Sequence, residues 1–386
     1  MKILFVSIPS LHAIRWIENL ENSGHELYWF DVLDRGKLYD NPNIRQFVNW
    51  KKRKFPYIKG EHFMRKKTSF FYDMIQPALE VTISEEFEKI INEIKPDLVH
   101  SFEMQSCSYP IFNIMQKYRN VSWLYSCWGS DLYYYKEFKK HNKKIKKVLN
   151  RINFLHTDCF RDFKIAKKLG FRGEFLGVIP GGGGFNLNEF INLKLPVKER
   201  NIILVKGYEH KFGRAINVIK ALELVVNEIK EFKVIVFGAH QKVIDYVNHN
   251  NLAFKVFDRH ELSHKELIIL MGKANIYIGN SISDGMPNTL LEAIIMNAFP
   301  IQSNPGNVTS EIIENEINGL LINNPEKISE IQNKIEQALR YNYEGKFETA
   351  ANKNTLIANE RLNYKINKQK ILNLYNKIHS SIKKIN

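Results

Sequence analysis

The sequence is poor in cysteine and has no apolar run long enough to cross a membrane. Its three cysteines, Cys107, Cys127 and Cys159, are widely spaced and form no CxxC pair. We therefore expect the reduced thiols of a cytosolic protein and neither a disulfide framework nor a zinc site. A membrane-spanning helix needs about 20 apolar residues in succession, so any membrane attachment is expected to be peripheral. The N-terminal residues MKILFVSIPSLHAIRW lack a small-residue cleavage site, so we expect a first strand here rather than a signal peptide.

Two ligand-binding motifs are also absent. The loop after the first expected strand reads SIPSLH, without the glycines of the GxGxxG fingerprint. Its absence argues against dinucleotide binding at this end of the chain. The sequence contains no DxD pair, so no metal site and no cofactor are expected.

Negative charge is scarce relative to positive charge. The 56 Lys and Arg residues outnumber the 41 Asp and Glu residues, and the formal net charge is +15. Such an excess calls for an anionic partner: nucleic acid, an anionic membrane surface or phosphorylated substrates. With 386 residues, of which 44% are hydrophobic, the chain is long enough for two domains with full cores.

Short apolar runs alternate with segments of helical period along most of the chain. This alternation predicts an α/β protein with parallel sheets. The expected strands are 2–8, 26–32, 97–102, 122–128, 154–158, 201–205, 233–238, 254–257, 276–278, 299–302 and 319–322.

Residues 276–304 form the most informative stretch, which reads as strand, loop, helix and strand. Asp284 lies in the loop, Pro287 suits the first helical turn, and Glu292 falls between core positions of the helix. A carboxylate placed there needs a partner, and the helix N-terminus favours an anion such as phosphate. A nucleotide sugar fits these features together, with a hydroxyl-bearing group near Glu292 and a second polyol near Asp284. The simpler interpretation is an ordinary strand–helix unit whose Glu292 points to solvent.

The segment SDGMPNTLLEA resembles the carboxylate–x7–carboxylate signature of the retaining GT-B glycosyltransferases of family 4. The resemblance implies that Asp284, where the family more often has Glu, contacts the donor sugar and that Glu292 contacts the ribose. The loop between them is expected to hold the distal phosphate of the donor. Its residues are Gly285, Met286, Pro287, Asn288 and Thr289.

The segment KGYEHKFGRA, after the strand expected at 201–205, carries basic residues where the family contacts the donor diphosphate. Lys206 and Lys211 stand at those positions, and Arg214 is close enough to share the task. Cations there stabilise the negative charge that develops on the leaving diphosphate. The simpler interpretation is surface lysines at a helix start.

The first half of the chain resembles the acceptor-binding half of the same family. LHAIRWIENLENSGHEL is similar to the first loop and helix of one subgroup, which implies that His12 points toward the acceptor or the donor sugar and that Arg15 assists. WGSD resembles the family's HGSD-like element, with Trp128 in place of the histidine and Asp131 matching the acid. We expect catalytic roles for His12, Lys211 and Asp284. The simpler interpretation of His12 is a capping or surface histidine.

Two basic segments, 50–74 and 136–151, distinguish the first half. The first interleaves lysine and arginine with aromatic residues, a pattern that suits a membrane surface or single-stranded nucleic acid. The simpler interpretation is a solvated basic loop over a few core aromatics. Nucleic acid would match the charge but not the expected sugar-transfer chemistry, so an anionic membrane surface is expected and nucleic acid is not.

Taken over nearly the whole chain, the resemblance implies a GT-B fold of two Rossmann-like domains with parallel sheets facing across a cleft. Residues 1–195 would form the acceptor-side domain, residues 196–365 the nucleotide-sugar domain, and a helix at about 366–386 would pack back on the first. The implied activity is metal-independent retaining hexosyl transfer from a UDP- or GDP-linked donor to a glycan or lipid-linked acceptor. The implied setting is cell-surface polysaccharide or glycolipid synthesis of bacterial type, at the inner face of the cell membrane.

Two other functions fit parts of the sequence. A sugar-nucleotide epimerase of GT-B type would share the fold and the ligand but need no acceptor. A basic RNA-binding protein on a Rossmann scaffold would account for the net charge.

Overall fold

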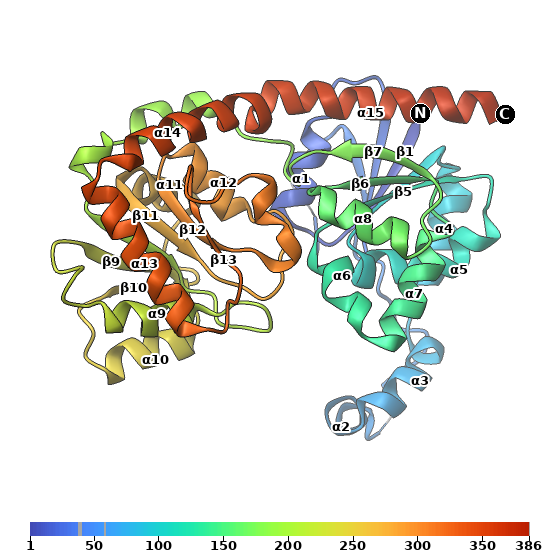
Figure 1. Ribbon diagram of the computed structural model, residues 1–386. Helices are drawn as coiled ribbons and strands as arrows, with labels where there is room; N and C mark the ends of the chain where they lie inside the picture. The colour runs from blue at the N-terminus through green and yellow to red at the C-terminus, as the bar shows by residue number, and fades with distance from the viewer. Residues whose placement is uncertain (38–40, 58, 386) are drawn as a thin grey trace. The chain divides into compact units, whose positions relative to one another are not determined.

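The computed structural model describes residues 1–37, 41–57 and 59–385, and they form two compact units (Figure 1). The first unit comprises Met1–Thr157, Phe163–Gly177 and the chain from Ile371 onward, and the second comprises Asp158–Asp162 and Val178–Lys370. The expected boundary at residues 195 and 196 therefore falls inside the second unit. The reason is that Phe190 is buried in the core of that unit and that the N–H of Phe185 donates to the carbonyl of Leu362 at 2.8 Å.

The first unit is built on a sheet whose strand order is β3-β2-β1-β4-β5-β6-β7. The pairs from β3 to β6 are all parallel. Among the described residues, these strands are β1 (Lys2–Ser7), β2 (Glu26–Asp31), β3 (Ile44–Phe47), β4 (Leu98–Phe102), β5 (Ser122–Cys127), β6 (Phe154–Thr157) and β7 (Glu174–Val178).

The second unit has its own parallel sheet with the order β10-β9-β8-β11-β12-β13. In β8, Ile202 and Leu204 face one core, whereas Ile203 and Val205 face the other, as expected for a sheet covered on both faces. Its strands in the described chain are β8 (Ile202–Lys206), β9 (Lys233–Ala239), β10 (Lys255–Asp258), β11 (Ala274–Gly279), β12 (Phe299–Ser303) and β13 (Leu320–Ile322).

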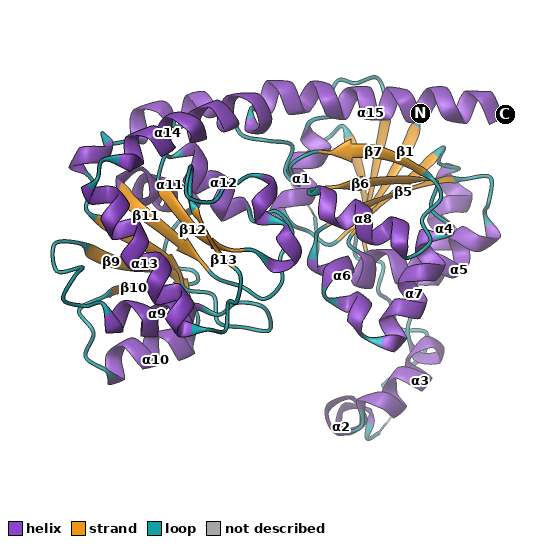
Figure 2. Ribbon diagram, viewed as in Figure 1, coloured by secondary structure: helices purple, strands orange, loops and turns teal. Residues whose placement is uncertain are grey.

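Helices connect the strands of each sheet (Figure 2). The first half of the chain contributes α1 (Leu11–Glu18), α2 (Glu61–Lys67), α3 (Ser69–Leu79), α4 (Ile83–Ile94), α5 (Tyr109–Lys117), α6 (Ser130–Tyr133), α7 (Lys139–Leu149) and α8 (Phe160–Lys168). The second half contributes α9 (Ala215–Leu224), α10 (Gln241–His249), α11 (His264–Lys273), α12 (Asn288–Ile295), α13 (Ile328–Tyr343), α14 (Lys346–Ile357) and α15 (Tyr364–Ile385).

The prediction of two Rossmann-like α/β domains is confirmed, and all the expected strands are present within two residues of their expected bounds. Two strands were missed. In β3, Arg45 and Gln46 interrupt the apolar pattern because the strand lies at the edge of its sheet. In β7, Gly177 adopts a φ of 106° and breaks the run of β-forming residues.

The basic segment at residues 50–74, expected as a loop or a membrane-binding stretch, contains α2 and α3. A buried polar cluster anchors it: the guanidinium of Arg53 pairs with Glu61 at 2.6 Å and with Glu80 at 3.4 Å. The hydroxyl of Tyr72 donates to both carboxylates at 3.3 Å. Figure 1 shows α2 and α3 extending away from the sheet of their unit. The side chains of Phe70 and Phe71 lie outside the described set.

The second basic segment, at residues 136–151, is mostly the helix α7. Its lysines are largely exposed, whereas Ile145, Val148 and Leu149 are buried. Arg151, at the end of the segment, is buried and donates to the carbonyls of Met115, Tyr118 and Val121. This arginine is therefore part of the framework and not of a basic surface.

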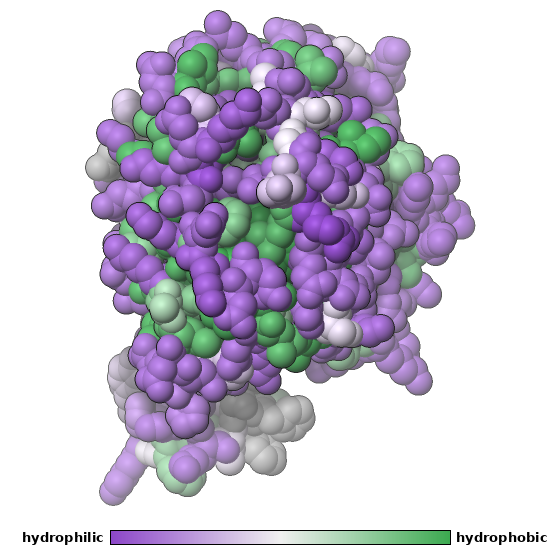
Figure 3. Space-filling model, turned by 60° about the vertical axis from the view of Figure 1, so that its left-hand side comes forward, coloured by the Kyte–Doolittle hydropathy of each residue, from purple (hydrophilic) through white to green (hydrophobic). Residues whose placement is uncertain are grey.

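The surface of the protein is largely hydrophilic on the face drawn in Figure 3, with small apolar patches between polar residues. None of the helices that the structure describes combines the length and the apolar character required to cross a bilayer. The three cysteines are free and buried.

The last helix, α15, joins the first unit from Ile371 onward. There the hydroxyl of Tyr375 accepts a hydrogen bond from the indole N–H of Trp16 at 3.0 Å and contacts Nδ1 of His100 at 2.6 Å. The other ring nitrogen of His100 contacts the hydroxyl of Ser126 at 2.7 Å. Because these groups are buried, each lost contact leaves an unpaired polar atom.

We expect Tyr375→Phe to lower the free energy of unfolding by about 1–3 kcal/mol, because the change leaves the indole N–H of Trp16 and Nδ1 of His100 without their buried partner. Urea denaturation of the full chain measures this difference. Tyr343→Phe, at a side chain that is 95% exposed, is the matched control and should have no effect. Equal stability of the two variants would contradict this role of Tyr375.

Candidate functional site

The candidate site in the second unit lies at the carboxyl ends of β8 and β11, the two adjacent strands from which the sheet is extended in opposite directions. Ligands of doubly wound sheets bind at such a switch point, because the loops on either side diverge there. Lys206 ends β8, the loop after β8 carries Lys211 and Arg214, and the loop after β11 carries Asp284. The fold thus places both expected donor-binding segments at one point of the sheet.

Backbone hydrogen bonds join these two loops. The N–H of Arg214 donates to the carbonyl of Asn280 at 3.0 Å, and the N–H of Ile282 donates to the carbonyl of Phe212 at 2.9 Å. Gly213 and Ser281 form an antiparallel bridge between them. A side chain at Gly213 would clash, because its Cβ would lie 2.1 Å from the carbonyl oxygen of Tyr208. The cationic loop is therefore fixed alongside the carboxylate loop.

The cations of this site hold different positions. The Nη1 of Arg214 donates to the carbonyl of Gly213 at 2.9 Å, and its Nε lies 3.3 Å from a carboxylate oxygen of Glu326. Lys206 ends β8, and its Nζ lies 4.6 Å from the ring centre of Tyr208. Lys211 is exposed, with its Nζ 5.5 Å from the ring centre of Phe212. Arg214 thus holds the loop, while the two ammonium groups lie over aromatic rings.

Arg259 belongs to this group of cations, although the sequence analysis did not single it out. Its guanidinium carbon lies 5.5 Å from the ring centre of Tyr208. Burial, followed by the charges of His240, Lys206, Arg259 and Arg214, lowers the pKa of His210. The basic side chains therefore create a positive potential at the carboxyl end of β8 that favours an anionic ligand.

The carboxylate loop is more tightly bonded than expected. The N–H of Gly285 donates to the side chain of Asp284 at 2.9 Å, and the N–H of Met286 donates to the side chain of Asp158 at 3.1 Å. Two of the amides expected to hold phosphate therefore already bind carboxylates. The amides of Asn288 and Thr289 begin α12, where the helix N-terminus favours an anion.

The hydroxyl of Thr289 is oriented by a buried tyrosine. Tyr277, in β11, donates its hydroxyl proton to Thr289 Oγ1 at 2.9 Å. Burial raises the pKa of Tyr277, so its phenol stays protonated and remains a donor. Since Thr289 accepts this bond, its own proton is available to be donated to a ligand.

Glu292 is buried in α12, where its side chain is only 5% exposed, as its position between core residues predicted. Its Oε1 lies 2.7 Å from Nε2 of His264, the first residue of α11. The required partner is therefore a histidine that is distant in the sequence, and the interpretation in which Glu292 points to solvent is wrong.

In the first unit, His12 and Trp128 come together at the carboxyl ends of β1 and β5. Their ring centres are 5.7 Å apart, and Phe102, at the end of the intervening strand β4, lies 6.1 Å from Trp128. Arg15 is one turn further along α1 and is half-buried. This is the switch point of the first sheet.

Asp131 has a different place from the one its motif suggested. It is buried, and its carboxylate accepts hydrogen bonds from the N–H groups of Met104 and Trp128, both at 3.0 Å, and from the hydroxyl of Tyr125 at 2.5 Å. The thiol of Cys127 adds a contact at 3.1 Å. Its carboxylate therefore organises the loop that presents Trp128.

Glu103, which directly follows β4, was missed by the sequence analysis. It adopts a φ of 67°, which is unusual for a residue with a side chain. Its carboxylate accepts the N–H groups of Gln105 at 2.9 Å and Ser106 at 2.5 Å. Burial, followed by the charge of Asp131, raises the pKa of Glu103 to about 7. The available sequence signal was a carboxylate directly after a central strand.

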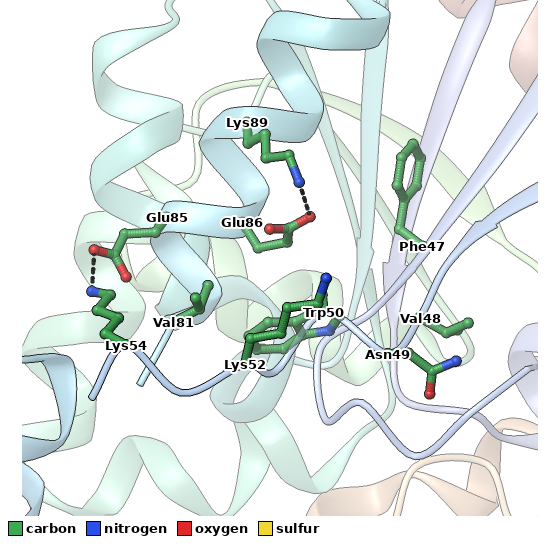
Figure 4. Close-up of a pocket in the computed structure, with 10 residues that line it drawn as sticks. All are labelled: Phe47, Val48, Asn49, Trp50, Lys52, Lys54, Val81, Glu85, Glu86 and Lys89. Atoms are coloured by element: carbon green, nitrogen blue, oxygen red, sulfur yellow. Dashed lines mark hydrogen bonds and ion pairs between the residues drawn. The ribbon is translucent and has the colours of Figure 1, made fainter. Parts of the chain in front are cut away.

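The first unit also has a cavity of about 520 Å³ beside the N-terminus of α4 (Figure 4). Trp50 and Val81 contribute apolar surface to it. The ion pair of Lys54 and Glu85, at 2.6 Å, and that of Lys89 and Glu86, at 3.2 Å, lie at its lining. Phe47 ends β3, so residues at the carboxyl edge of the sheet, the edge that also carries His12 and Trp128, line part of the cavity.

Comparisons with known families match both halves of the chain. Residues 188–356 match the family described as "Glycosyl transferases group 1". Residues 2–161 match the family described as "Glycosyl transferase 4-like". A comparison with curated proteins gave no match.

Solved structures show the same fold at low sequence identity. Sucrose-phosphate synthase from Thermosynechococcus elongatus is 16% identical with a TM-score of 0.72, over 99% of this chain and 100% of that one. A glycosyltransferase from Rickettsia africae is 15% identical with a TM-score of 0.70, over 100% and 99%. Anabaena Alr3699/HepE, solved with UDP-glucose, is 14% identical with a TM-score of 0.66, over 98% and 100%.

We expect the raised pKa of Glu103 to make stability depend on pH. Between its ordinary value of 4.5 and about 7, the folded protein keeps a proton that the unfolded chain has released. The free energy of unfolding should therefore fall as the pH rises through this window. Glu103→Gln should reduce that fall in thermal unfolding, whereas Glu137→Gln, at a side chain that is 68% exposed, should not. Parallel pH profiles for all three proteins would contradict the assignment.

Proposed function

We propose that this chain is a GT-B glycosyltransferase that takes its sugar from a nucleotide diphosphate donor bound to the second unit, since residues 2–161 and 188–356 match glycosyltransferase families and each unit is built on a parallel, Rossmann-like sheet. One observation carries the proposal: the cations Lys206 and Arg214 follow β8, and the helix with the buried carboxylate Glu292 follows the adjacent strand β11, on either side of the switch point of the second sheet. The Anabaena neighbour, solved with UDP-glucose, supports a donor of this chemical class.

Each part of the donor has a group of suitable chemistry. Glu292 accepts hydrogen bonds from the ribose hydroxyls, and its pairing with His264 holds the carboxylate in place. The amides of Asn288 and Thr289, with the Thr289 hydroxyl, bind the distal phosphate at the start of α12. Asp284 contacts the donor sugar. The roles of Asp284 and Glu292 come from the resemblance to family 4, and the contacts of Glu292 with His264 and of Thr289 with Tyr277 support them.

Lys206, Lys211 and Arg214 stabilise the leaving diphosphate without a metal ion. The supporting observation is the group of basic side chains at the end of β8, where burial, followed by the neighbouring charges, lowers the pKa of His210. Negative charge grows on the leaving group in the transition state, so fixed cations there lower the barrier. The sugar is transferred with retention by front-face attack, with the leaving diphosphate as the base.

On the first unit, His12, Arg15 and Trp128 face the acceptor, and Trp128 offers an aromatic ring on which a sugar stacks. The cavity beside α4 offers room for a further part of a glycan or lipid-linked acceptor. Its combination of indole surface with ammonium and carboxylate groups suits a polyol.

The donor assignment predicts a specific loss on changing Glu292. Isothermal titration with UDP-glucose and GDP-mannose, with EDTA present throughout, should identify one donor that binds. For that donor, Glu292→Ala should weaken binding by about 1–3 kcal/mol, as expected for a lost hydrogen bond to a charged group. Strict dependence of binding on a divalent cation would contradict the metal-independent part of the proposal.

A second variant separates the ribose contact from local structure. His264→Gln removes the imidazole that contacts Glu292 but leaves the carboxylate in place, so it should weaken donor binding less than Glu292→Ala does. If the two changes weaken binding equally, the carboxylate acts only through His264 and the ribose assignment is wrong.

An anionic membrane surface is the proposed location of the acceptor. The segment around α2 and α3 exposes large apolar side chains, with Tyr57 78%, Phe63 64% and Met74 67% exposed. Exposed lysines accompany them at Lys51, Lys52, Lys66 and Lys67. Apolar residues enter the headgroup layer, and each lysine near an anionic surface adds about 1 kcal/mol.

The proposed location is the inner face of the cell membrane. Flotation with liposomes tests the binding to an anionic membrane surface that this location requires. Binding should require anionic lipid, fall with added salt and decrease when Lys51, Lys52, Lys66 and Lys67 are changed to Ser. Arg53 and Lys54 are left unchanged because their ion pairs with Glu61 and Glu85 hold the segment together.

The matched control changes four exposed lysines of the second unit to Ser, namely Lys233, Lys242, Lys255 and Lys273. It removes the same charge and should leave flotation unchanged. Equal loss in both quadruple variants would mean that net charge alone drives binding. Absence of binding to either kind of liposome would return the acceptor to a soluble glycan.

A further inference from the structure

A short segment from the middle of the chain, Asp158–Asp162, belongs to the second unit and lies against the carboxylate loop. We propose that two of its residues, Asp158 and Arg161, are positioning residues that hold the backbone of Asp284–Met286 in the conformation required for sugar transfer. The inference rests on the proposed donor site. It assigns a function at that site to two residues that precede the carboxylate loop by more than a hundred positions in the sequence.

Arg161 binds the loop from one side. Its Nη2 donates to the carbonyl of Asp284 at 2.8 Å, and its Nη1 donates to the carbonyl of Pro305 at 2.8 Å. Its Nε donates to Asp162 at 2.8 Å, and Asp162 is fully buried. Because the side chain of Arg161 is itself only 7% exposed, the guanidinium is fixed and not a mobile surface group.

Asp158 binds the next peptide of the same loop. One of its carboxylate oxygens, Oδ2, accepts the N–H of Met286 at 3.1 Å. The other, Oδ1, is buried and lacks a hydrogen-bond partner among the described residues. Burying a carboxylate that is only partly hydrogen-bonded is unfavourable. The hydrogen bond from the Met286 N–H partly offsets this unfavourable free energy. Burial, followed by the charge of Asp162, raises the pKa of Asp158.

Gly285 stands between the two attachment points, and the contact requires it to be a glycine. A Cβ at this position would lie 2.4 Å from Asp158 Oδ2, closer than any real contact. The carboxylate therefore lies directly against the backbone of Gly285. The glycine in SDGMPN is therefore explained by packing, independently of any nucleotide: the missing side chain leaves room for the carboxylate of Asp158.

The segment that carries the two residues is itself anchored. The carboxylate of Glu311 accepts the N–H of Phe160 and the N–H of Arg161, each at 2.7 Å, at the start of α8. Arg361 in turn donates to the carbonyl of Glu311 at 2.6 Å. Asp158 and Arg161 therefore connect the carboxylate loop to a segment that is itself held in place within the same unit.

The consequence concerns the sugar more than the nucleotide. With the carbonyl of Asp284 and the N–H of Met286 both held, the peptides around Gly285 cannot rotate, and the Gly285 N–H keeps its bond to Asp284. These contacts thereby fix the orientation of the Asp284 carboxylate, the group that contacts the donor sugar in the proposed function. Glu292 and the cations that bind the nucleoside diphosphate have separate supports. A misplacement of about 1 Å in a reacting geometry can lower a rate about 100-fold.

The test uses Asp158→Ala, Asp158→Asn and Arg161→Ala in the full chain, with UDP and UDP-glucose as probes. Release of UDP from UDP-glucose in water gives kcat, and titration calorimetry gives the Kd of UDP. Asp158→Ala and Arg161→Ala should each lower kcat at least tenfold and change the Kd of UDP less than twofold. Asp158→Asn keeps an acceptor oxygen for Met286, so it should retain most of the activity.

Arg151→Ala is the control for a merely structural role. Arg151 is also buried and also donates to backbone carbonyls, but in the first unit. It should lower the melting temperature without the selective fall in kcat. If folded Asp158→Ala and Arg161→Ala variants keep the kcat of the unchanged protein, or lose UDP affinity in parallel with kcat, the positioning role is overturned.

Hydrogen exchange tests the attachment without any ligand. The N–H of Met286 should exchange faster in Asp158→Ala than in the unchanged protein, and Asp158→Asn should restore its protection. Unchanged exchange at Met286 would overturn the inference even in an active enzyme. Failure of the unchanged protein to bind any nucleotide sugar, with the exchange pattern as expected, would instead overturn the proposed function and leave the positioning contact supported.

Discussion

The hydrogen bonds that join Phe212–Arg214 to Asn280–Ile282 are the constraint on which the second unit depends. They fix two loops that leave adjacent strands at the point where the sheet is extended in opposite directions. Without them, the lysines after β8 would be surface charges at a helix start, as the simpler interpretation of the sequence held. With them, the loop that carries the cations is joined to the loop that leads into α12.

The fold was predictable because its signals are local. Buried parallel strands read as apolar runs, and each of the expected runs is a strand. Asp284 and Glu292 were identified from a motif whose parts are close in the sequence. What could not be predicted is what those residues contact. His264, Asp158 and Arg161 reach this site through the fold, and no spacing in the sequence indicates that they do.

The missed residues share a physical cause. A buried charge is stabilised by partners from other elements, so its role follows from tertiary structure. Asp131 was identified by its match to the family acid, but the motif does not show that its carboxylate is bound by groups of its own unit. Arg151 looked like the end of a basic surface, yet it is buried among carbonyls. Glu103 carries a raised pKa that only its burial beside Asp131 reveals.

The most direct test of the account is a crystal structure of the protein grown with the nucleotide sugar that binds it. The account predicts the ribose on Glu292, the diphosphate between Lys206 and the start of α12, and the Met286 N–H still bonded to Asp158. A nucleotide bound away from the carboxyl ends of β8 and β11, or a Glu292 carboxylate that contacts only His264, would contradict it.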